Sequence, residues 1–155
     1  QSEMNRRRFE RQLLALCAAR TDLALVHADA LASVQWHDPA CAAVSASMLD
    51  TLADDPAASP AAIVGAASMA EPRAAGFLTR GVPESAVPED LAAFLVEELS
   101  IGDAEEAVAA MRAQMSAPDS MSAEDYELMF QTVAAMQREL TARKRAHAES
   151  AASSR

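Results

Sequence analysis

Two runs of apolar residues near the end of the chain repeat at alternating three- and four-residue steps. The first run is Ile101, Ala104, Val108, Met111 and Met115, and the second is Tyr126, Met129, Val133, Met136 and Leu140. This spacing is the heptad pattern of helices that pack along a narrow apolar seam. Because the runs are equally long and flank the turn "SAPDSMSAED", they predict an antiparallel helical hairpin.

The rest of the chain also favours helix. Alanine is abundant, glycine occurs only four times, and no stretch alternates with period two for long enough to predict a strand. An opening helix is expected to bury one face that consists of Phe9, Leu13, Leu16 and Cys17. After it, Thr21-Asp22 is expected to cap a second helix whose inward side carries Leu23, Val26, Ala30 and Leu31.

Proline that directly follows a capping residue predicts further helix starts. Asp38-Pro39 predicts a helix that ends near Leu52, and Ser59-Pro60 predicts a short helix. Pro88 begins the long helix that leads into the hairpin, and Ser122 is the expected N-cap of the last helix. A further short helix is expected around Phe77, with Gly102 as a weak point or bend in the long helix.

These elements predict an all-α fold in two parts. An N-terminal helical bundle is expected over residues 5–99, and the C-terminal antiparallel hairpin over residues 100–147. Residues 148–155 are expected to be a disordered tail. A hairpin alone buries only one seam, at roughly 1.5–3 kcal/mol for each fully buried large side chain, which barely offsets the entropy of ordering it. We therefore expect a second surface to cover Tyr126, Leu128 or Phe130.

The charge distribution argues against direct nucleic-acid binding. The net charge is −10, and residues 21–127 hold 19 of the 23 acidic side chains. A duplex-binding surface needs several clustered basic side chains. The basic runs Arg6-Arg7-Arg8 and Arg143-Lys144-Arg145 are confined to the two ends and are interpreted as solvated helix faces.

No motif of catalysis or metal binding is visible in the sequence. Cys17 and Cys41 form no CxxC pair, which favours a reducing, cytoplasmic location and buried thiols. The candidate metal ligands are His27, His37, Cys17 and Cys41, but they form no repeated ligand pair, and His37-x-x-x-Cys41 alone is too little for a zinc site, which normally needs four donors. The glycines lie too far apart for a phosphate-binding loop. No apolar stretch approaches the roughly 20 residues of a membrane-spanning helix. We expect no catalytic residue, no metal, no cofactor and no membrane association.

Three segments resemble the C-terminal helicase-binding domain of bacterial replicative DNA primase. They are "FERQLLALCAARTDLA", "VQWHDPACAAVSASML" and "DYELMFQTVAAMQRELTARKR", and the likeness covers roughly residues 8–146. Trp36 stands where the family often has phenylalanine. The family fold is a helical bundle followed by a helical hairpin, and the N-terminal domain of the replicative helicase shares the bundle architecture.

The resemblance implies a protein-interaction domain that is not itself an enzyme. Primer synthesis would belong to upstream zinc-binding and catalytic regions, and this domain would dock on the N-terminal domain of the hexameric replicative helicase. The expected contact residues are Tyr126, Phe130, Gln137, Leu140, Arg143 and Arg145. The alternatives are a bundle like the N-terminal domain of the helicase, and a structural helical module that associates weakly with itself.

Overall fold

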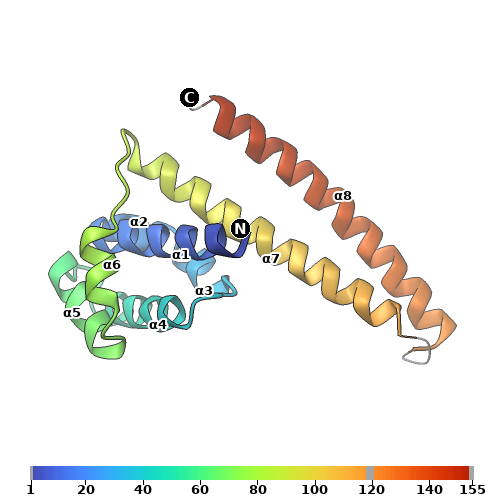
Figure 1. Ribbon diagram of the computed structural model, residues 1–155, viewed down its shortest axis with the longest axis horizontal. Coiled ribbons are helices and arrows are strands. Elements are labelled where there is room, and N and C mark those ends of the chain that lie inside the picture. Colours follow the sequence, from blue (N-terminus) through green and yellow to red (C-terminus); the bar gives the residue numbers. More distant parts are fainter. Residues whose placement is uncertain (1, 118–120, 154–155) are drawn as a thin grey trace. The chain divides into compact units, whose positions relative to one another are not determined.

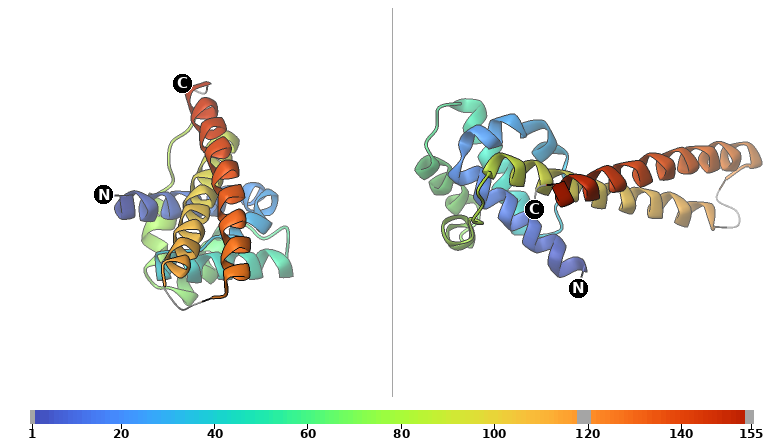
Figure 2. Two further views of the ribbon diagram at one scale, coloured as in Figure 1. Left: turned by 90° about the vertical axis from the view of Figure 1, so that its right-hand side faces the viewer. Right: turned by 90° about the horizontal axis from the view of Figure 1, so that it is seen from above.

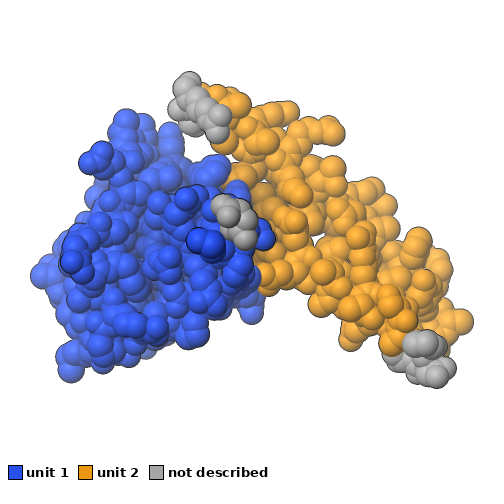
Figure 3. Space-filling model, viewed as in Figure 1, with its two compact units in different colours: residues 1–99 blue, residues 100–155 orange. Residues whose placement is uncertain are grey.

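The computed structural model describes residues 2–117 and 121–153, and all regular secondary structure within them is α-helical. This confirms the predicted all-α class. The helices are α1 (Ser2–Ala19), α2 (Thr21–Val26), α3 (Ala28–Ser33), α4 (Pro39–Asp54), α5 (Pro60–Ala70), α6 (Ala74–Arg80), α7 (Pro88–Met115) and α8 (Ala123–Ser153) (Figure 1). The chain divides into two compact units, residues 1–99 and residues 100–155, so the boundary falls inside α7 (Figure 3).

Helix α1 contributes a large part of the core of the first unit. It packs against α2, α4, α5 and α6. Every residue from Leu13 to Ala18 is buried, including Leu16 and Cys17 of the predicted face, while Phe9 is partly buried against the same core. A helix that is apolar on all sides over more than one turn has to be enclosed by other elements. The core of the first unit therefore forms around this part of α1.

Helix N-caps in the sequence predicted where three helices begin. Three predicted caps make the expected side-chain hydrogen bond: Asp38 Oδ1 accepts from the Ala40 amide at 3.0 Å, Ser59 Oγ from Ala62 at 3.1 Å, and Ser122 Oγ from Asp125 at 3.1 Å. Each bond satisfies one of the amide groups that a helix start leaves without an intrahelical acceptor. The predicted starts of α4, α5 and α8 are confirmed.

The segment after Arg20 differs from the prediction of one capped helix. Two short helices, α2 and α3, meet at His27, and α2 has no side-chain cap. Val26, which we expected to face inward, is 75% exposed. The buried residues of α2 are Leu23 and Ala24, whereas Val26 is the last residue of this helix, directly before the break at His27, and is not part of the core of the first unit.

The last helix is longer than expected. Residues 148–153, predicted to be part of a disordered tail, continue α8 as far as Ser153. This stretch, "AESAAS", is rich in alanine, the residue with the highest helix propensity, and contains neither glycine nor proline. Residues 154–155 lie outside the described part of the chain.

In the second unit, the second half of α7 and helix α8 run side by side in opposite directions (Figure 2). Ile101, Val108, Val133 and Leu140 are buried between them, and Ala104, Met111, Met115, Met129 and Met136 pack against these four. Arg112 Nη2 donates to Gln137 Oε1 at 3.1 Å, and Lys144 Nζ lies 3.8 Å from Glu105 Oε2. Both pairs are one heptad apart on each helix, as an antiparallel register requires.

Candidate partner-binding groove

Tyr126 is the residue that departs from the heptad pattern. The other nine apolar heptad residues belong to one hydrophobic cluster, called here the hairpin seam, whereas Tyr126 is 43% exposed and outside it. Phe130, one turn further along α8, is 53% exposed. Two aromatic side chains that share one face of a helix are therefore left half uncovered within the hairpin.

A groove of about 650 Å³ follows this face of the hairpin. It is lined by Arg112 and Met115 of α7 and by Tyr126, Phe130, Val133, Ala134, Gln137, Arg138 and Thr141 of α8. The α8 residues are three or four positions apart, or direct neighbours of such positions, so they form one continuous stripe along the helix. The groove is therefore a flank of the hairpin seam, and both helices contribute to it.

The groove is apolar at one end and polar at the other. Met115, Tyr126 and Phe130 line it close to the end of α7 and the beginning of α8. Farther along α8 lie Gln137 and Arg138. An apolar surface with a few polar groups at one edge is the usual composition of a recognition site.

Hydrogen bonds inside the hairpin fix part of the polar end. Arg112 donates to the Gln137 side chain, and Thr141 Oγ1 donates to the Gln137 backbone carbonyl at 2.9 Å. Arg138 is exposed and has no hydrogen-bond or ion-pair partner among the described residues. One guanidinium is thus positioned by the hairpin, and a second is directed to solvent.

The structure brings together three of the six expected contact residues. Tyr126, Phe130 and Gln137 line the groove. Leu140 does not, because it is 4% exposed and buried in the hairpin seam. Arg143 donates to Ser100 Oγ at 2.8 Å, and Arg145 is exposed but outside the groove lining.

Six groove residues were not among the expected contacts: Arg112, Met115, Val133, Ala134, Arg138 and Thr141. The available signal was the heptad register. Arg112 directly follows the seam residue Met111, and Arg138 lies eight residues after Phe130 and so on its side of the helix. Met115 and Val133 belong to the seam itself, whereas the flank of each seam identifies Arg112 and Arg138.

Leu128 provides a contrast on the same helix. It is 66% exposed, more than either aromatic residue, but it does not line the groove. Two positions from Tyr126 and from Phe130, it points away from their side of α8. Exposure of a large apolar side chain therefore does not by itself identify the groove.

A buried polar cluster lies within the first unit. Glu10, fully buried, accepts hydrogen bonds from Arg6 Nε at 2.8 Å, from the His37 amide at 2.8 Å and from the Asp38 amide at 3.0 Å. Arg6 also donates to the backbone carbonyls of Gln35 and Leu99. These bonds satisfy backbone groups of the segment before α4, so we assign the cluster a structural role.

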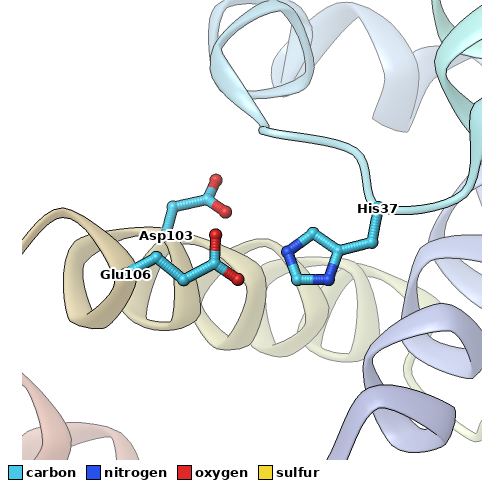
Figure 4. A group of neighbouring side chains, drawn as sticks. All are labelled: His37, Asp103 and Glu106. Carbon is cyan, nitrogen blue, oxygen red and sulfur yellow. The ribbon is translucent and has the colours of Figure 1, made fainter. Parts of the chain in front are cut away.

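Three of the residues considered as metal ligands, His37, Cys17 and Cys41, differ in their contacts and their burial. His37 lies on the segment that leads into α4 (Figure 4). Its Nδ1 is 2.9 Å from Glu3 Oε2. Hydrogen bonds hold the pKa of Glu3 below its usual value. The bond with His37 has the larger effect, and the bond with Arg7 has the next largest. Cys17 and Cys41 are both buried and free, and burial raises the pKa of each thiol to about 12. A thiol with so high a pKa is a poor nucleophile and metal ligand.

Two acidic side chains, Asp103 and Glu106, project from α7 three residues apart, the first half-buried and the second exposed (Figure 4). They lie in the second unit and do not line the groove. Among the described residues, no helix is both long enough and apolar enough to cross a bilayer.

Comparisons with protein-family models, with curated proteins and with solved structures found no match to this chain.

Proposed function

We propose that the chain is the non-catalytic, helicase-docking domain of a bacterial replicative DNA primase. Its hairpin groove would bind the N-terminal domain of the replicative helicase and so couple primer synthesis to unwinding. The proposal combines the resemblance of the three sequence segments named above with one observation, the groove that contains the half-exposed Tyr126 and Phe130.

The physical basis is apolar surface that the hairpin does not cover. Aromatic side chains carry much of the binding energy in protein interfaces because they bury a large area at a small cost in conformational entropy. Phe130 is 53% exposed, so covering its remaining surface should contribute about 0.8–1.5 kcal/mol, half of the value for a fully buried phenylalanine. Covering the exposed part of the Tyr126 ring should contribute a similar binding free energy.

The shape of the groove suits a helical partner. It is open and elongated along α8, and its lining follows the three- and four-residue spacing of that helix. An amphipathic helix laid along such a groove places side chains from every turn into it. A helical domain of the helicase would offer this kind of surface.

The test is calorimetric titration of the full chain with the N-terminal domain of the cognate helicase. Phe130→Ala should weaken binding about four- to tenfold, because it removes an aromatic contact worth about 0.8–1.5 kcal/mol. Leu128→Ala is the matched control, since it removes an exposed apolar side chain from the same helix outside the groove. An equal loss of affinity in both variants, or no binding by the unaltered chain, would refute the proposal.

Self-association provides a second readout of the same groove. Sedimentation velocity of the chain alone should give a monomer whose mass does not change in Phe130→Ala. A dimer that dissociates on this substitution would instead assign the groove to a second copy of the chain and reject helicase docking as its role.

A further inference from the structure

The charges around the groove restrict which helix it can accept. The lining contains two arginines, Arg112 and Arg138, and no carboxylate. The chain as a whole carries a net charge of −10, so a positive edge at this position is opposite in sign to the molecule. Complementary charge at an interface steers association and penalises partners of the wrong sign.

The two arginines are suited to different roles. Arg112 is held against Gln137 by the 3.1 Å hydrogen bond, which leaves the other nitrogens of its guanidinium as donors. Arg138 is exposed with no partner among the described residues, and a partner carboxylate could accept from it without displacing an internal bond. Arginine offers a planar pair of donors that matches a carboxylate.

The distance between the apolar and the basic part sets the spacing in the partner. Phe130 and Arg138 are eight residues apart in α8, which is about 12 Å along the helix axis at 1.5 Å per residue. A helix lying along the groove would cover the same distance in seven or eight residues. Its acidic residue must therefore lie about two turns from its large apolar residue, on the same face.

We propose that the groove selects an acidic amphipathic helix, in which an apolar residue fills the space beside Tyr126, Phe130 and Met115 and a carboxylate two turns away binds Arg138 and Arg112. The inference rests on the proposed docking role of the groove, and it specifies the chemistry of the segment that docks. A basic or neutral amphipathic helix is discriminated against.

The test uses four fluorescent peptides of about 20 residues, long enough to form helix on binding. All share one apolar face with a central phenylalanine. The first has glutamates two turns to either side of this residue on the same face, and the second has the same composition with the glutamates moved to the opposite face. The third and fourth carry glutamine and lysine at the positions of the first. Each peptide is titrated with the full chain and followed by fluorescence anisotropy.

The first peptide should bind most tightly, and its affinity should fall as salt is raised. Arg138→Gln should weaken it about threefold, the usual effect of an exposed charge pair, and Arg138→Glu about tenfold. Arg138→Glu should also reverse the order of the glutamate and lysine peptides. Arg8→Glu is the control for net charge, because Arg8 is exposed on α1 and does not line the groove. Circular dichroism verifies that each variant remains folded.

The inference is overturned if the glutamate, glutamine and lysine peptides bind equally, if the shifted glutamates bind as well as the aligned ones, or if no peptide binds. These outcomes are separate from those of the proposed function. If the helicase domain binds and Phe130→Ala weakens it, but Arg138 variants and salt change nothing, helicase docking stands and the acidic selection fails. If the aligned glutamate peptide binds through Arg138 while the helicase domain does not bind, the selection stands and the helicase assignment fails.

Discussion

Replacing Glu10 by glutamine should destabilise the first unit far more than an isosteric change normally does. The Glu10 carboxylate is fully buried and accepts from three donors, the Arg6 guanidinium and the amides of His37 and Asp38. A glutamine side chain keeps one oxygen and replaces the other with an NH₂ group. Whichever way the amide is oriented, its NH₂ group faces at least one of these N–H donors.

The expected magnitude follows from this geometry. Removing one partner of a buried ion pair costs about 3–5 kcal/mol, because the remaining charge stays out of water. Arg6 is 9% exposed and cannot easily turn to solvent. A domain of this size is typically stable by about 5–15 kcal/mol, so Glu10→Gln should remove a large part of the stability of the bundle.

Urea unfolding followed by tryptophan fluorescence measures this effect. Trp36 is the only tryptophan and precedes His37 directly, so its emission reports on the segment that Glu10 holds. Glu3→Gln is the matched control, since Glu3 is an exposed carboxylate on the same helix whose pairs with Arg7 and His37 are screened by water and should contribute little to stability. A loss below about 1 kcal/mol for Glu10→Gln would show that the buried cluster does not hold the bundle together as described.

Three further predictions concern the core thiols, the seam and the end of α8. Because burial raises the pKa of Cys17 and Cys41 from 9.0 to about 12, both thiols should resist alkylation in the folded protein at neutral pH. The stability that the two neutral thiols contribute is complete below pH 9.0 and is lost as the pH rises toward about 12, because the thiols of the unfolded chain ionise first. A Cys17→Ala/Cys41→Ala variant should therefore show a shallower decline in the free energy of unfolding over this pH range. An unchanged slope would contradict the raised pKa of the buried thiols. Leu140→Ala should cost about 2–5 kcal/mol and speed hydrogen exchange along α8, since it leaves a cavity in the seam, whereas Thr141→Ala at the exposed neighbour should not. Ala151→Gly should lower the helical chemical shifts of residues 148–153 because glycine costs about 1 kcal/mol in a helix, and random-coil shifts in the unaltered chain would reject the observed extent of α8.

Local signals in the sequence were sufficient for most of the helices. Asp38-Pro39 and Ser59-Pro60 predicted helix starts because a cap depends on residues within one turn. Val26 was misplaced for the opposite reason. Its helical spacing allowed it to face inward, and only the packing of Leu23 and Ala24 in the folded unit decides that it does not.

The candidate site shows the same division between local and tertiary information. A second surface was expected over Tyr126, Leu128 or Phe130, and Tyr126 and Phe130 are half exposed. Tyr126 also stood at a heptad position of the predicted seam, and the structure leaves it outside the seam. Leu140 was expected to contact the partner, although its heptad position also predicted a seam residue. In the structure it is buried in the hairpin seam. Arg112 reaches the groove from the other helix, and the amides that donate to Glu10 lie 27 and 28 residues away, so neither relation could be predicted from local spacing.

The most direct test of the docking surface is a nuclear magnetic resonance titration of the isotope-labelled full chain with the unlabelled N-terminal domain of the cognate helicase. We predict that the largest shift changes and line broadening follow the groove, at Met115, Tyr126, Phe130 and Ala134, while Leu128 changes little. Changes confined to residues 1–99, or centred on Leu128, would contradict the assignment of the hairpin groove as the docking surface.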